Sequence, residues 1–286
     1  MALLRLVFAL VAAVVFAGAA TAASPTLDRI KASGTITFGY RDGAAPFSIK
    51  QRNGQVRGYS VELCEKVAAA VGRAVGLAEL KVTWRPVDSE TRISDVANRR
   101  IDAECGTTTI TLSRMERVDF SLPIFVDGGS ALVRAGRDAP TRVADLAGKR
   151  VAVMPGTTTE TSLGKVLAVA GAKATVVPVK DSAAGIASLL AGKVDAFASD
   201  RMVLTQLKAT DAHGADLAFV QDDFSYEPYG LVLPRDDPEF RLLVNRTLSG
   251  LYRSGEIDPI FIRWLAPYGN PGPLLNAMFY LNSLPE

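Results

Sequence analysis

Hydrophobic and polar positions alternate with two different periods along the chain. Stretches of β-branched and aromatic residues bounded by polar ones, such as 35–40 and 80–87, are typical of strands. In 59–75, by contrast, apolar residues recur at the three- and four-residue spacing of a helix. The same reading predicts further helices at 90–99, 143–147, 158–170, 182–191 and 201–209, and further strands at 101–105, 149–154, 174–179 and 194–199. This alternation predicts an α/β fold in which helices cover mostly parallel sheets.

Two stretches of the chain, about 90 residues apart, have the same construction. "ISDVANRRIDAECGTTT" and "IASLLAGKVDAFASDRM" each contain a helical pattern, a basic residue, Asp-Ala and a strand that ends in polar residues. We therefore expect two lobes of similar construction, with Thr107 to Thr109 and Ser199-Asp200 in equivalent positions. Ligands of open α/β sheets collect at the carboxyl ends of the strands, so both positions are candidates for binding.

Residues 1–23 differ from the rest of the chain. Arg5, an unbroken apolar run and the small residues Ala20-Thr21-Ala22 form the pattern of a secretory signal peptide, with cleavage after Ala22 or Ala23. The alternative is a membrane anchor, because the apolar run approaches the length of a spanning helix. The small residues favour cleavage, so we expect a periplasmic protein whose mature chain begins near Ser24.

Composition and charge argue against several classes of protein. The chain has 32 basic and 30 acidic residues, a net charge of +2, and so gives no indication of a nucleic-acid partner. Its glycines form neither the dinucleotide nor the phosphate-loop pattern. One histidine and two cysteines suggest no metal site. We therefore expect neither a cofactor nor a metal.

The two cysteines lie in different predicted elements. Cys64 falls in the helix 59–75, and Cys105 ends the strand 101–105. In an oxidising compartment a lone pair of thiols tends to be joined, and a bond from helix to strand is geometrically feasible. The alternative is two small buried apolar side chains. The sequence leaves both interpretations open.

Hydroxyl groups gather after the strand 101–105. "ECGTTTITLSR" ends in Arg114, and hydroxyls with one guanidinium at the end of a strand suit a carboxylate held bidentately. In "MPGTTTETSL", Thr157 stands at an N-cap with Glu160 three residues on, which is the spacing of a capping box. The free amides of that helix start then face an anion. The alternative is a well-capped helix without a ligand.

Several motifs occur in a familiar order: "GYRDGAAPFS", "GYSVELCEKVA", "RIDAECGTTTITLSRMERVDFSLP", "GKRVAVMPGTTTET", "DAFASD" and "YGLVLPRDDPEF". They resemble the periplasmic solute-binding proteins that supply polar amino acids to ABC importers, and most of all the glutamate/aspartate-binding branch. The resemblance extends over about 26–264. It implies two α/β lobes joined by two strands, as in a periplasmic-binding-protein fold. Residues 24–125 plus 236–286 would form the first lobe and 130–230 the second, with hinges at about 126–130 and 230–235.

The resemblance also implies how an amino acid is bound. Arg114, Thr109 and the amides of Thr157 and Thr158 match the positions that hold the α-carboxylate, and Asp200 matches the position that holds the ammonium. Two further arginines and a serine match the positions that hold a side-chain carboxylate. Facing a carboxylate, each arginine makes charge-assisted bonds of about 1.5 to 3 kcal/mol. The candidate ligand-binding residues are Arg41, Ser89, Arg92, Thr107, Thr109, Arg114, Thr157, Thr158, Ser182 and Asp200.

One candidate departs from the branch. Ser182 stands where the acidic-ligand proteins have a histidine, so the preference between glutamate and aspartate stays open. Phe47 and Tyr59 either wall the pocket or belong to the core. The tail after Trp264 either packs on its own lobe or contacts the importer.

We expect a monomeric, non-catalytic binding protein that captures glutamate or aspartate by closure of its lobes. It would deliver the ligand to the membrane subunits of an ABC importer. One alternative is an exported enzyme of the cyclohexadienyl dehydratase type on the same fold, with Glu104 or Glu227 as its acid. The others are a binding protein for another polar amino acid and a sensor module.

Overall fold

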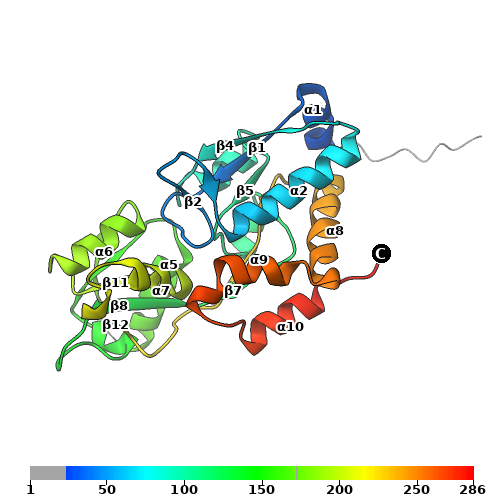
Figure 1. Cartoon of the computed structure of the whole chain (residues 1–286). Helices are drawn as coiled ribbons and strands as arrows, with labels where there is room; N and C mark the ends of the chain where they lie inside the picture. Colours follow the sequence, from blue (N-terminus) through cyan, green and yellow to red (C-terminus); the bar gives the residue numbers. More distant parts are fainter. Residues whose placement is uncertain (1–23, 172) are drawn as a thin grey trace, which may run out of the picture.

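The computed structural model describes residues 24–171 and 173–286, which form two α/β lobes (Figure 1). The predicted signal peptide lies outside the described residues. The sheet of the first lobe has the strand order β4-β1-β5-β14-β6. Its strands are β4 (Lys81–Pro86), β1 (Thr35–Tyr40), β5 (Ala103–Cys105), β14 (Val232–Leu233) and β6 (Asp119–Phe120).

The sheet of the second lobe has the order β10-β9-β11-β8-β12. Its strands are β10 (Thr175–Pro178), β9 (Arg150–Val153), β11 (Ala196–Asp200), β8 (Gly129–Arg134) and β12 (Leu217–Phe219). In both sheets the first three strands are parallel and the last two pair antiparallel. Because β5 and β11 hold the same place in the two sheets, the predicted equivalence of the two sequence stretches is confirmed.

The expectation of mostly parallel sheets is wrong at one edge of each lobe. Strands β14 and β8 pair antiparallel with β5 and β11 because each continues a strand that arrives from the other lobe. Those crossing strands are β7 (Phe125–Asp127) and β13 (Glu227–Tyr229), which pair antiparallel, with Glu227 opposite Asp127. Gly128 joins β7 to β8, and Gly230 follows β13. The lobe boundaries and the hinge stay predictions, and they coincide with this pair of strands.

Helices from both ends of the chain cover the sheet of the first lobe. They are α1 (Pro25–Ser33), α2 (Tyr59–Val75), α8 (Pro238–Ser254), α9 (Ile257–Trp264) and α10 (Pro273–Leu281), with α3 (Arg92–Ala97) and α4 (Leu112–Met115) near the second lobe. One core contains Leu63 of α2, Val244 of α8 and Met278 of α10. The tail after Trp264 therefore packs on its own lobe, and its residues 266–268 also contact residues 201–210 of the second lobe. Phe47 and Tyr59 are fully buried in the same core.

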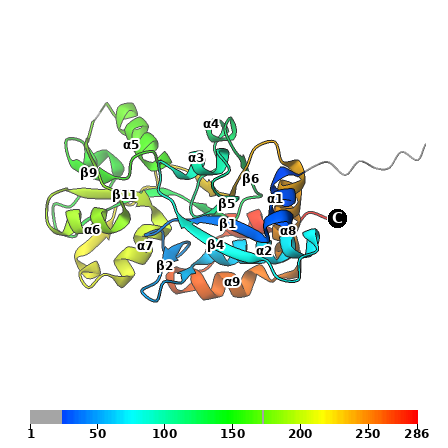
Figure 2. The same ribbon diagram turned by 90° about the horizontal axis from the view of Figure 1, so that it is seen from above.

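The second lobe places helices on both faces of its sheet (Figure 2). Its helical elements are η1 (Val143–Leu146), α5 (Thr158–Val169), α6 (Ser182–Leu190) and α7 (Arg201–Thr210). Leu163 of α5 packs with Val151 on one face, and Leu189 of α6 packs with Phe197 on the other. The second lobe also contains the short 3₁₀ helix η2 (Gly214–Asp216). The remaining elements belong to the first-lobe segments: the hairpin of β2 (Ile49–Lys50) and β3 (Val56–Arg57), and the short 3₁₀ helix η3 (Ala266–Tyr268). Within the described ranges, no helix is both long and apolar enough to cross a membrane.

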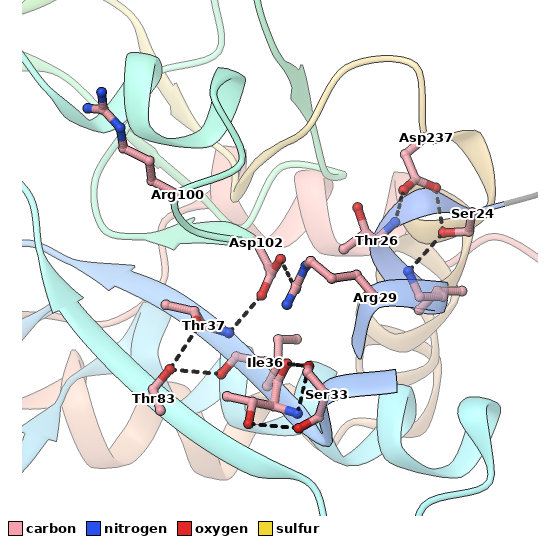
Figure 3. Close-up of polar contacts among 12 residues, drawn as sticks. Ser24, Thr26, Arg29, Ser33, Ile36, Thr37, Thr83, Arg100, Asp102 and Asp237 are labelled. Atoms are coloured by element: carbon pink, nitrogen blue, oxygen red, sulfur yellow. Dashed lines mark hydrogen bonds and ion pairs between the residues drawn. The ribbon is translucent and has the colours of Figure 1, made fainter. Parts of the chain in front are cut away.

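Two carboxylates tie the start of the described chain to the first lobe (Figure 3). Asp237 accepts hydrogen bonds from the Ser24 hydroxyl (2.6 Å) and the Thr26 amide (2.9 Å). Asp102 accepts from the Thr37 amide at 2.7 Å and from the Arg29 guanidinium. These bonds join segments more than 60 residues apart in sequence, so they help to fix β5, which leads into the hydroxyl cluster.

Cys64 of α2 and Cys105 of β5 form a disulfide, with their Cα atoms 6.3 Å apart. Both cysteines are fully buried. Just beyond Cys105, the Gly106 carbonyl accepts a hydrogen bond from the Ser60 hydroxyl at 2.8 Å. The disulfide and this bond fix the end of β5 against the start of α2. They therefore hold the following threonines in place.

Candidate ligand-binding site

A cavity lies between the lobes at the carboxyl ends of the parallel strands. The first lobe lines it with Arg41, Ala44, Arg92, Thr107 and Thr109, and the second with Met154, Thr157, Thr158, Thr159, Ser182, Ser199, Asp200 and Val203. The two predicted strand ends thus meet in one cavity, with Thr107 and Thr109 from the first and Ser199 and Asp200 from the second. Of the candidate residues, Ser89 and Arg114 do not line it.

Two buried arginines form one wall of the cavity. Arg41 follows β1, and its Nη1 donates to the Thr107 hydroxyl at 3.2 Å, while its Nη2 lies 3.9 Å from Met154 Sδ of the other lobe. Arg92 begins α3 and is only 2% exposed, and its Nε has no hydrogen-bond partner among the described residues. Burial, and then the charges of Arg41 and Arg114, lowers the pKa of Arg92 to about 9. A bound anion would compensate these crowded positive charges.

A buried carboxylate stands behind these arginines. Glu104 on β5 is 0% exposed, and neither of its carboxylate oxygens has a hydrogen-bond partner within the described ranges. Burial raises the pKa of Glu104, while Arg92 and Arg41 oppose that shift. Glu104 does not line the cavity, so its charge acts on the arginines rather than on a ligand.

Arg114 lies beside the cavity in an adjoining crevice. That crevice shares Thr109, Thr157 and Thr158 with the cavity and is also lined by Glu227. Arg114 Nη1 donates to the Thr109 carbonyl at 2.7 Å, which holds the guanidinium next to the shared threonines. Burial lowers the pKa of Arg114, and Glu227 opposes that shift.

The start of α5 has the predicted cap. The Thr157 hydroxyl accepts from the Glu160 amide at 3.2 Å, and Glu160 Oε2 accepts from the Gly156 amide at 3.0 Å. Gly156 adopts φ +70°, and a Cβ there would lie 3.3 Å from the Ser89 carbonyl. Ser89 therefore lies at the contact between the lobes instead of in the cavity, because the turn at Gly156 before α5 approaches its backbone closely.

One acidic side chain, Asp200, lines the cavity from the second lobe, and Asp127 lies close enough to interact with its charge. Asp200, the last residue of β11, accepts from the Thr159 hydroxyl at 3.3 Å. Burial, and then the charge of Glu227, raises the pKa of Asp200 to about 6. Asp127 on the crossing strand accepts from the Tyr229 hydroxyl at 3.1 Å, and burial, followed by Asp200, raises its pKa to about 7. Asp200 is therefore placed to bind a cation in the cavity.

Ser182 begins α6, directly after the N-cap Asp181, and lines the cavity. The sequence reasoning missed Met154, Thr159, Ala44 and Val203. Met154 could have been found, because it follows β9 as Arg41 follows the equivalent strand β1. No group of three or more His, Cys, Asp or Glu side chains in 24–171 and 173–286 could hold a metal ion.

The family model and the named relatives that match this chain agree with one another. Residues 36–267 match the model of the bacterial extracellular solute-binding proteins, family 3. The glutamate/aspartate import solute-binding protein of Escherichia coli K12 is 32% identical over 90% of this chain and 84% of its own length. The L-glutamate/L-aspartate-binding protein of Pseudomonas aeruginosa PAO1 is 35% identical over 84% of this chain and 79% of its own.

Among solved structures, the chain resembles the ancestral amino acid-binding protein AncCDT-1, described as a precursor of cyclohexadienyl dehydratase. The TM-score is 0.73 and the identity 29%, over 84% of this chain and 99% of that protein.

Proposed function

Because the chain belongs to family 3 of the bacterial extracellular solute-binding proteins, we propose that it captures glutamate or aspartate between its lobes for an ABC importer. Relatives named for binding these two acids match most of the chain, which supports the choice of ligand. The preference between the two acids rests on the space beside Ser182.

The charges that converge on the cavity carry this proposal. Arg41 and Arg92 are at most 8% exposed and lie together, Arg114 adjoins the shared threonines, and Asp200 faces them. An acidic amino acid supplies one carboxylate for Arg41 and Arg92, another for Arg114, and an ammonium for Asp200. An amide side chain would leave the two buried guanidinium groups without a counter-charge, which is unfavourable in a desolvated site.

The proposed mechanism is closure of the lobes around the ligand. Arg41, Arg92 and Arg114 all belong to the first lobe, so an amino acid binds there first. The contacts from Thr158 and Asp200 come from the second lobe and form on closure. A ligand shifts a conformational equilibrium through such differential contacts, so it raises the fraction of the protein that is closed above the fraction that is closed without ligand.

We propose binding without catalysis. The two acids that could serve an enzyme are placed elsewhere: Glu104 is buried behind the arginines, and Glu227 is held by three hydroxyl groups. The matched relatives are also named as binding proteins. We further propose an exported monomer, with its signal peptide removed near Ala22, whose closed form the importer's membrane subunits recognise.

Calorimetric titration of the mature protein tests this function. The protein is unfolded and refolded to remove bound ligand, then titrated with glutamate, aspartate, glutamine, asparagine and an apolar amino acid. We expect Kd values of about 1 μM or lower, about −8 kcal/mol, for the two acids alone. Equal or tighter binding of an amide or apolar amino acid would overturn the roles given to Arg41 and Arg92.

The affinity for glutamate should fall as the pH drops below about 6. In the free protein the Asp200 carboxylate is protonated below its pKa of about 6, whereas a ligand ammonium requires its charged form. Binding must then release a proton, so Kd rises by up to about tenfold per pH unit. Calorimetry between pH 5 and 7, in buffers of different ionisation enthalpy, measures both Kd and proton release.

The control for this pH dependence is Asp200→Asn. It should bind more weakly at every pH and lack the proton release assigned to Asp200. Any proton release that remains would come from Asp127, which still titrates in this variant. If the parent protein bound glutamate equally well at pH 5 and 7 without releasing a proton, Asp200 would not hold the ammonium.

A further inference from the structure

Glu227 is buried on the crossing strand β13 and has no place in the binding scheme above. Its side chain is 0% exposed, and it lines the crevice beside the cavity. Three hydroxyl groups meet its carboxylate. Oε2 accepts from Thr109 Oγ1 at 2.5 Å and from Thr158 Oγ1 at 2.6 Å, and Oε1 accepts from Ser225 Oγ at 2.6 Å.

The two donors on Oε2 come from different lobes. Thr109 follows β5 of the first lobe, and Thr158 begins α5 of the second. Each hydroxyl has a single proton, and O–H donors at 2.5 to 2.6 Å from a carboxylate are typical of charge-assisted hydrogen bonds. Glu227 thus joins two threonines, 118 and 69 residues away in sequence, at one oxygen atom.

Glu227 falls within the predicted bounds of the second lobe, but the backbone that follows it is hydrogen-bonded to the first lobe. The Ile110 amide donates to the Pro228 carbonyl at 2.7 Å, and the Gly230 amide donates to the Thr108 carbonyl at 3.1 Å. The bond from Thr109 to Glu227 therefore joins two segments that move together. The bond from Thr158 crosses between the lobes, so it requires that they be closed.

We infer that Glu227 is a latch: a positioning residue that stabilises the closed form by binding the Thr158 hydroxyl of the second lobe. The inference rests on the proposed function, because a latch matters when closure retains a ligand. The bond involves no ligand atom, so it slows release of any amino acid that the closed cavity accepts. Its loss should increase the dissociation rate and leave the association rate, set in the open form, nearly unchanged.

A double-mutant cycle of Glu227→Gln and Thr158→Val tests the latch. Rapid-mixing kinetics with glutamate should show a dissociation rate about tenfold higher for each variant and an association rate within about threefold of the parent. The double variant should release glutamate no faster than the single ones, because both remove the same bond. Thr210→Val, which removes an exposed hydroxyl at the end of helix α7 of the same lobe, is the matched control and should release glutamate like the parent.

Small-angle scattering of the ligand-free variants gives a second readout. The radius of gyration should be larger for Glu227→Gln and Thr158→Val than for Thr210→Val, and this comparison requires no ligand. If Glu227→Gln did not fold, the dissociation rate and the radius of gyration of Thr158→Val alone would test the latch. Unchanged dissociation rates, or rate increases that multiply in the double variant, would overturn the latch.

Failure of the proposed function would look different. The parent protein would then bind no acidic amino acid in calorimetry, and the kinetic cycle would be run with the amino acid of the panel that it does bind. If none bound, equal radii of gyration in all the variants would overturn the latch, and larger radii in the two latch variants would support it.

Discussion

Replacing Arg114 with alanine is expected to weaken the binding of every amino acid by about 30-fold or more. The guanidinium is the group assigned to the α-carboxylate, which all amino acids share, and its Nη1 is held by the Thr109 carbonyl. Leaving a desolvated carboxylate unpaired costs about 2 to 5 kcal/mol. This corresponds to a loss of affinity of roughly 30-fold to several thousand-fold. Calorimetry with glutamate, aspartate and glutamine measures it.

Arg117→Ala is the matched control for this experiment. Arg117 lies three residues further along and is exposed, so its removal changes the same charge without touching the site. It should bind all ligands like the parent protein. Arg114 adjoins the cavity and does not line it, so the experiment decides whether its guanidinium binds the α-carboxylate. If Arg114→Ala kept its affinity within about threefold, the α-carboxylate would be bound by the amides of α5 alone.

Replacing Arg92 should remove the discrimination between acidic and amide side chains. Arg92 is almost fully buried, so alanine would open a cavity, whereas methionine keeps the apolar stem and removes the charge. Glutamate affinity should fall by about 1.5 to 3 kcal/mol, roughly 10- to 150-fold, and glutamine affinity by much less. The ratio of the two Kd values measures the effect.

Arg85→Met on β4 serves as the control for a lost surface charge, because Arg85 is exposed. Thermal unfolding of Arg92→Met should accompany the titrations, since Glu104 loses its largest opposing positive charge when Arg92 is replaced. A folded Arg92→Met protein that bound glutamate as tightly as the parent would show that the side-chain carboxylate lies elsewhere.

Much of the secondary structure could be read from local patterns. The helix 59–75 and the strand 35–40 occur with the predicted bounds, because burial of one helical stripe or of a short strand leaves a periodic signature. The N-cap at Thr157 was also predictable, since it depends on residues within one turn. Boundaries were weaker where tertiary contacts shorten an element: the helix expected at 90–99 extends over Arg92–Ala97 alone.

The candidate site was predictable where it follows the internal repeat. Thr107 to Thr109 and Asp200 were placed at equivalent strand ends, and the sheets bring Thr107, Thr109 and Asp200 into one cavity. Arg114 was also found from the hydroxyl cluster, and the resemblance to a family added Arg41 and Arg92. The pairing of the cysteines was left open because a bond between a helix and a strand depends on how the two pack.

The sequence by itself determined the α/β alternation, the two similar lobes and the kinds of charge available to a ligand. The tertiary structure decided the burial of Arg92, the place of Arg114 beside the cavity, the position of Ser89 at the lobe contact and the role of Glu227 between two threonines. The reason is physical: helix and strand patterns are set by neighbours within a few residues. Burial, charge compensation and hydrogen bonds between lobes depend on groups that are far apart in sequence until the chain has folded.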